Sequence, residues 1–115
     1  MQPIFVFGSN LAGRHGKGAA KFAREQYGAV YGVGEGPTGH AYALPTKDQG
    51  LRTRTLPNIQ NSVRTFIAYA RSRPDLEFTV TRVGCGLAGY KDTDIAPLFR
   101  GAPKNCILPL GWRDM

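Results

Sequence analysis

Short apolar runs alternate with amphipathic stretches along this chain. The run IFVF, residues 4–7, is continuous and rich in aromatic and β-branched residues, as is typical of a strand covered on both faces. Three more runs predict strands: HAYAL at 40–44, EFTVTRVG at 77–84 and NCILPL at 105–110.

The stretches between these runs predict helices. AAKFAREQYG, residues 19–28, fits a helix that stops at its terminal glycine. A longer helix is expected from about 57 to 72, because apolar residues repeat there at the helical period: Leu56, Ile59, Val63, Phe66, Ile67 and Ala70. The segment 31–39, YGVGEGPTG, reads as a loop.

A short third helix is expected over 93–101, TDIAPLFRG, with Asp92 or Thr93 as its N-cap. Strands that alternate with helices at this spacing predict one α/β domain over residues 1–115, with a mostly parallel sheet.

Polar and glycine residues follow three of the predicted strands. In open parallel sheets the ligand crevice lies beyond the carboxyl ends of the strands. Those ends are Gly8-Ser9-Asn10, Pro45-Thr46-Lys47 and Gly84-Cys85-Gly86. We therefore expect these residues on one rim of the sheet.

Two loops on that rim are rich in glycine and each leads into a helix. They contain Gly13, Gly16 and Gly18 in the first, and Gly84, Gly86 and Gly89 in the second. Backbone N–H groups of such loops converge on anions, and a helix N-terminus adds partial positive charge. The first loop is neither a Walker nor a dinucleotide motif. The pair predicts a diphosphate cradle, although glycines that merely build tight turns are the alternative.

Composition fits a globular protein with a preference for phosphate-bearing ligands. Of 115 residues, 42% are hydrophobic, and 15 Lys and Arg against 8 Asp and Glu give a formal charge of +7.

No long apolar run or basic leader is visible, so we expect a cytoplasmic protein without a membrane partner. Cys85 and Cys106 are expected to be reduced thiols.

Several motifs together resemble the macrodomain family over nearly the whole chain. They are FVFGSNLAGRHGKGAAKFAREQYG, YALPTKD, VTRVGCGLAGYKDTDIAPLF and NCILPL. The nearest branch contains terminal ADP-ribose glycohydrolase and bacterial antitoxins that remove ADP-ribose from thymidine in DNA. The resemblance implies a three-layer fold with helices on both faces. It also implies a shortened N-terminus, because family members usually begin with a further strand whose aspartate recognises adenine.

The resemblance further implies a function and a site. The chain would bind ADP-ribose and remove it from a nucleic-acid base or an acidic side chain, without a metal or another cofactor. Lys47 would be the catalytic nucleophile and Tyr90 would pack on the distal ribose. The other ligand-binding residues would be Ser9, Asn10, Gly16, Lys17, Gly18, Thr46, Gly84, Cys85, Gly86, Leu87, Ala88 and Gly89.

The lysine chemistry depends on neighbouring charges. An amine that attacks the anomeric carbon gives a lysyl adduct that water resolves, and a lysine with its ordinary pKa near 10.4 is mostly protonated. Arg14 and Lys17 are candidates for repelling that proton. Terminal ADP-ribose glycohydrolase has an aspartate where this chain has Ala88, and Asp48 or Asp92 is a candidate substitute or simply a loop or capping residue.

Three alternatives stay open. In the first, Lys47 is a solvated cation in a loop and not a nucleophile. In the second, the domain binds ADP-ribose or a related NAD-derived signal without cleaving it. A basic stripe of Lys17, Lys21 and Arg24 would suit a nucleic-acid-binding domain.

The remaining candidates favour structural roles. His15 and His40 lack metal-ligand spacing and favour surface or loop positions, whereas Trp112 favours a packed anchor.

Overall fold

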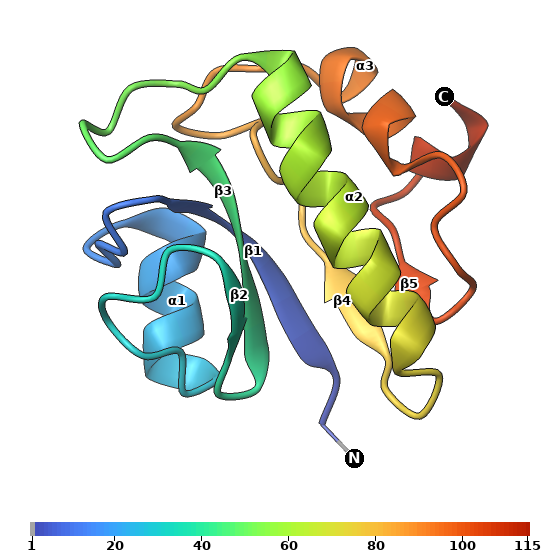
Figure 1. Cartoon of the computed structure of the whole chain (residues 1–115), viewed down its shortest axis with the longest axis horizontal. Coiled ribbons are helices and arrows are strands. Elements are labelled where there is room, and N and C mark those ends of the chain that lie inside the picture. Colours follow the sequence, from blue (N-terminus) through green and yellow to red (C-terminus); the bar gives the residue numbers. More distant parts are fainter. Residues whose placement is uncertain (1) are drawn as a thin grey trace.

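The computed structural model describes residues 2–115, and the strands in this range build a mixed, five-stranded sheet (Figure 1). The strand order is β2-β3-β1-β4-β5, and the bounds are Ile4–Asn10 for β1, Gly36–Thr38 for β2, Ala41–Lys47 for β3, Phe78–Val80 for β4 and Cys106–Ile107 for β5. β1 pairs in parallel with β3 and β4, and β4 in parallel with β5. β2 runs antiparallel to β3. The predicted α/β class and mostly parallel sheet are confirmed.

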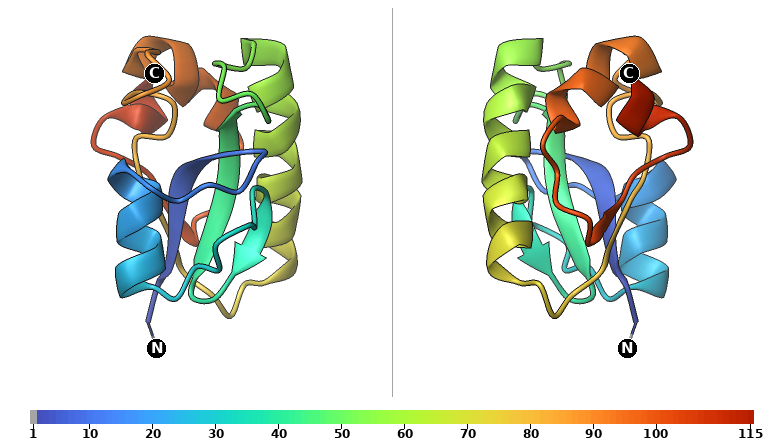
Figure 2. Two further views of the ribbon diagram at one scale, coloured as in Figure 1. Left: turned by 90° about the vertical axis from the view of Figure 1, so that its left-hand side faces the viewer. Right: turned by 90° about the vertical axis from the view of Figure 1, so that its right-hand side faces the viewer.

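Helices cover both faces of the sheet, as the two side views in Figure 2 show. Their bounds are Gly18–Gln26 for α1, Leu56–Ser72 for α2 and Asp92–Ile95 for α3, with 3-10 turns η1 at Ala96–Phe99 and η2 at Trp112–Asp114. α1 packs on one face, and α2 and η1 share an apolar cluster on the other.

Alternation along the central strands divides the core between the two faces. In β1, Val6 packs in the cluster under α2, whereas Phe7 packs in the cluster under α1. In β3, Leu44 faces α2 and Ala43 faces α1. Because both faces are covered, these strands are apolar at consecutive positions, which is why they read as continuous runs in the sequence.

Two predictions about strands are wrong, one on each side of the central strands. The segment 31–39 is not all loop, because β2 lies within it. The strand expected over 77–84 covers only Phe78–Val80. The Thr81 N–H and hydroxyl still donate to the Val6 carbonyl, at 3.1 and 2.7 Å, and the Val83 N–H then donates to the Thr81 carbonyl at 2.7 Å, which turns the chain.

The last predicted strand, 105–110, contains only two strand residues. The Cys106 N–H donates to the Pro103 carbonyl at 3.0 Å, and the Arg113 guanidinium donates to the Cys106 carbonyl at 2.7 Å. These contacts turn the chain out of the sheet.

The N-cap predicted for the short helix is also wrong. Lys91, not Asp92 or Thr93, is the N-cap of α3, and the Asp94 carboxylate accepts the Lys91 N–H at 3.0 Å. Pro97 lies in the turn that continues α3 as η1.

The C-terminal turn is anchored as predicted. Trp112 is 2% exposed and packs against Phe99, with ring centroids 5.5 Å apart. Both cysteines are free thiols. Within residues 2–115, no helix combines the length and apolar character needed to cross a bilayer.

Candidate functional site

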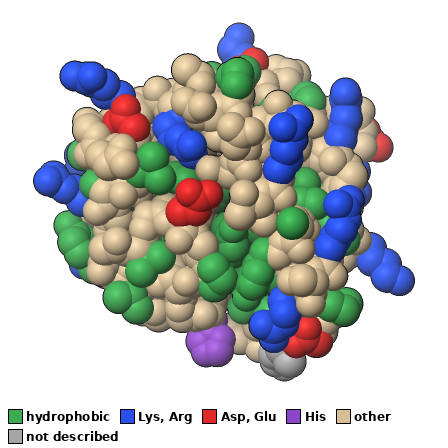
Figure 3. All heavy atoms as spheres, viewed as in Figure 1, with side chains coloured by type: hydrophobic (Ala, Val, Ile, Leu, Met, Phe, Trp, Pro, Cys, Tyr) green, Lys and Arg blue, Asp and Glu red, His purple; other side chains and the backbone are tan. Residues whose placement is uncertain are grey.

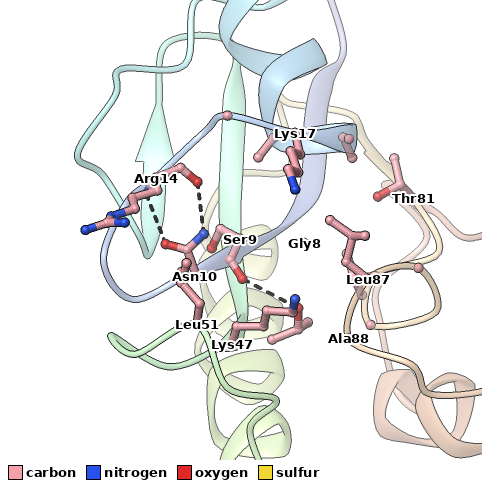
Figure 4. A pocket seen from close by; sticks show the side chains of 18 of the residues that line it. Gly8, Ser9, Asn10, Arg14, Lys17, Lys47, Leu51, Thr81, Leu87 and Ala88 are labelled. Carbon is pink, nitrogen blue, oxygen red and sulfur yellow. Dashed lines mark hydrogen bonds between the residues drawn. The ribbon is translucent and has the colours of Figure 1, made fainter.

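A cavity of about 610 Å³ lies at the carboxyl ends of the central strands. One wall is the first glycine loop, residues 11–17, with the start of α1; the opposite wall is the second glycine loop, residues 84–89 (Figure 4). Its lining is Gly8, Ser9, Asn10, Arg14, Gly16, Lys17, Gly18, Ala19, Ala20, Tyr31, Thr46, Lys47, Leu51, Thr81, Arg82, Val83, Gly84, Gly86, Leu87 and Ala88.

Most residues expected at the site line this cavity. They are Ser9, Asn10, Gly16, Lys17, Gly18, Thr46, Lys47, Gly84, Gly86, Leu87 and Ala88. Cys85, Gly89 and Tyr90 do not line it. The Leu87 side chain reaches across toward the first loop, because a Cβ built on Gly18 would lie 4.0 Å from Leu87 Cδ1. The two glycine loops therefore face each other.

Four glycines of the two loops form two contrasting pairs. Gly13 and Gly84 have φ of +71° and +77°, and an added Cβ would lie 2.3 Å from the Gly32 backbone or 3.0 Å from Ile95 Cδ1. The fold itself requires these glycines. Gly16 and Gly86 have neither a positive φ nor any atom within 4 Å of an added Cβ. The fold leaves open space beside the backbone at both positions.

Backbone N–H groups are available on both walls. Within residues 2–115, no acceptor takes the N–H of Gly86, Leu87 or Ala88. α1 begins without a side-chain cap or an acidic residue in its first turn, so its first N–H groups are open as well, and Ala19 and Ala20 line the cavity. Both walls can therefore donate hydrogen bonds to an anion.

The charged lining is entirely cationic. Arg14, Lys17, Lys47 and Arg82 line the cavity, and within residues 2–115 no carboxylate, imidazole or thiol does. In Figure 4 the Lys17 and Lys47 ammonium groups point toward each other from opposite sides of Gly8, whereas the Arg14 guanidinium points away. Figure 3 shows that basic side chains also outnumber acidic ones on the outer face it presents. This charge favours anionic ligands.

The polar residues that end β1 are partly engaged. The Asn10 side chain donates to the Arg14 carbonyl at 2.9 Å and accepts the Arg14 N–H at 3.0 Å. The Ser9 hydroxyl donates to the Gly34 carbonyl, and the Thr46 hydroxyl lies 3.5 Å from the Ser9 carbonyl. Asn10 therefore braces the first loop, Ser9 is tied to the segment before β2, and both residues also line the cavity.

Asp48 and Asp92 are the two candidates to replace the aspartate that stands at the position of Ala88 in terminal ADP-ribose glycohydrolase. Both form hydrogen bonds outside the cavity. The Asp48 carboxylate accepts the N–H groups of Gly50 and Arg52 at 2.9 and 3.0 Å. The Asp92 carboxylate pairs with Arg82 at 2.8 Å and accepts the Trp112 indole N–H at 2.8 Å. Those hydrogen bonds, first from Arg82 and then from Trp112, hold the pKa of Asp92 below its usual value.

Cys85 and Tyr90 point away from the cavity into the fold. Burial, followed by the nearby Asp92 charge, raises the pKa of the Cys85 thiol, so the nucleophilic thiolate is disfavoured. The Tyr90 hydroxyl donates to the Arg54 carbonyl at 2.6 Å, and its ring packs against the main core. Tyr90 thus ties the second loop to the segment that follows β3.

His15 lies in the first loop, one of the two positions predicted for it, but it is not at the surface. Its side chain is fully buried beneath the first loop, with Nε2 3.0 Å from the Val33 carbonyl and its ring edge-on to Phe7. Among residues 2–115, no hydrogen-bonding partner reaches its Nδ1. Its contacts fasten the first loop to the segment before β2.

Seven lining residues were not among those that the sequence placed at the site: Ala19, Ala20, Tyr31, Leu51, Thr81, Arg82 and Val83. Thr81, Arg82 and Val83 lie between the end of β4 and the second loop, whereas the sequence pattern assigned them to the strand and therefore did not place them at the site. Tyr31 and Leu51 lie in polar or glycine-rich segments, where single apolar residues carry no periodic signal.

Comparison of the chain with protein-family models, curated proteins and solved structures finds no match.

Proposed function

We propose that this chain is a macrodomain-like protein that binds ADP-ribose and hydrolyses it from a modified target. The observation that carries the proposal is the cavity between the two glycine loops. It combines open backbone N–H groups on both walls, two glycines that the fold does not require, and a cationic lining. Such a cradle suits a diphosphate, the central group of ADP-ribose.

In this proposal Lys47 acts on the distal ribose. Its amine, in the deprotonated form, attacks the anomeric carbon while the bond to the target breaks and the target leaves with the electron pair. Water then displaces the amine and forms free ADP-ribose. The half-buried position of Lys47 at the end of β3, with its nitrogen directed into the cavity, supports this role (Figure 4). The target is a nucleic-acid base or an acidic side chain.

Replacing Lys47 with alanine is expected to reduce the release of ADP-ribose about a thousandfold or more, because the nucleophile is lost. The measurement uses ADP-ribosylated DNA and ADP-ribosylated protein, with product separated by chromatography. Lys21→Ala is the matched control, since Lys21 is an exposed lysine on α1 outside the cavity. Equal rates for wild type and Lys47→Ala would exclude the lysine mechanism.

A non-catalytic binder of ADP-ribose or a related NAD-derived nucleotide is the second candidate. The observation that favours it is the cavity lining, which within residues 2–115 holds no carboxylate or imidazole to activate water. Calorimetry followed by recovery of the ligand separates the two candidates. A binder takes up an ADP-ribosylated substrate and returns it unchanged, whereas a hydrolase releases ADP-ribose.

A further inference from the structure

Leu51 has a backbone conformation that its residue type disfavours. It is the one non-glycine residue among 2–115 with a positive φ, at 63°. For a bulky side chain such a φ is a genuine outlier, since the Cβ crowds the following carbonyl. Gly50, the residue before it, has no positive φ. The residue with the left-handed backbone conformation in this turn is therefore a leucine, although a glycine directly precedes it.

Hydrogen bonds hold this turn in place. The Asp48 carboxylate accepts the N–H groups of Gly50 and Arg52, and the Leu51 N–H donates to the Asp48 carbonyl at 3.1 Å. Just beyond, the Thr53 hydroxyl donates to the Ala88 carbonyl at 3.0 Å. The turn is thus tied both to itself and to the second glycine loop.

Packing in the core does not explain why a leucine stands at position 51. Leu51 is 42% exposed and belongs to neither apolar cluster of the core, yet it lines the cavity. In Figure 4 it lies beside Lys47 and Asn10, on the opposite side of the cavity from Leu87. A strained residue that the fold does not need, held rigidly at a cavity wall, points to a ligand contact.

From this geometry we propose that Leu51 is a specificity-determining residue for the group joined to the sugar beside Lys47. This inference rests on the proposed function, which puts the anomeric carbon next to Lys47. The apolar side chain favours a flat, uncharged ring on that carbon over a small polar group such as a hydroxyl, which would bury less apolar surface against leucine.

Two available ligands test this preference. ADP-ribose carries a hydroxyl at the anomeric carbon, whereas NADH carries an uncharged dihydronicotinamide ring there. Leu51→Gly removes the side chain and suits the positive φ, so the melting temperature is expected to rise by roughly 3–6 °C. By calorimetry, the affinity for NADH should fall about tenfold while that for ADP-ribose changes less than about twofold.

Two further variants sharpen the test. Leu51→Asn also tolerates a positive φ and, being polar, should lower the affinity for NADH in the same selective way. Leu110→Ala truncates a fully exposed leucine outside the cavity and should leave the ratio of the two affinities unchanged. An unchanged ratio in Leu51→Gly, with ADP-ribose bound normally, would overturn this inference alone. Failure of wild type to bind ADP-ribose would overturn the proposed function together with it.

Discussion

Replacing Gly86 with alanine is expected to lower the affinity for ADP-ribose about 100-fold while the protein stays at least as stable as wild type. Gly86 lines the cavity, and its added Cβ would meet no protein atom within 4 Å, so the methyl group would compete only with a ligand. Alanine also reduces the freedom of the unfolded chain, which favours folding by about 0.4–1 kcal/mol. Calorimetric titration with ADP-ribose and thermal unfolding measure the two effects.

Gly84→Ala is the matched control in the same loop. Its φ of +77° and the 3.0 Å approach of an added Cβ to Ile95 should lower the melting temperature. The two variants thus separate a glycine that the fold requires from one that the ligand requires. Undiminished binding by Gly86→Ala would show that the second loop does not cradle the diphosphate.

Replacing Trp112 with alanine is expected to destabilise the fold by about 3–5 kcal/mol, as large truncations in a core do. The indole is 2% exposed, packs on Phe99 and donates to the Asp92 carboxylate. Asp92 also pairs with Arg82, a residue of the cavity wall, so loss of the indole N–H from Asp92 is expected to affect the position of Arg82 as well. Urea unfolding of wild type and variant measures the change in free energy.

Trp112→Phe distinguishes packing from hydrogen bonding in that result. Phenylalanine keeps much of the buried ring but removes the N–H, while Asp92 retains its pair with Arg82. We expect a cost of about 1–2 kcal/mol for this variant. A cost of less than 1 kcal/mol for Trp112→Ala would contradict the anchoring role.

The position of the cavity could be predicted because it follows from the topology. Parallel strands present their carboxyl ends at one edge, so residues directly after each apolar run had to converge there. Gly8, Thr46 and Gly84 come from distant parts of the chain and line one cavity for this reason. β2 could not be predicted, because its sequence Gly-Pro-Thr has no strand character and pairing with β3 alone makes it a strand.

The direction of individual side chains could not be predicted from local sequence. Tyr90 follows the second loop, yet its hydroxyl bonds to Arg54, 36 residues earlier. Asp92 resembles a helix cap, yet it pairs with Arg82 and Trp112, which only the tertiary fold brings near. The positive φ of Leu51 depends on how Asp48 closes its turn, and the neighbouring glycine would have been the natural candidate.

The backbone amides proposed to hold the diphosphate can be observed directly. A titration of ¹⁵N-labelled wild-type protein with ADP-ribose, followed by two-dimensional NMR, reports each amide separately. The account predicts that the largest shifts fall on Gly16 and Gly18 in one wall and on Gly86, Leu87 and Ala88 in the other. Saturating ADP-ribose that leaves these amides unmoved, or that shifts only residues outside the cavity, would contradict it.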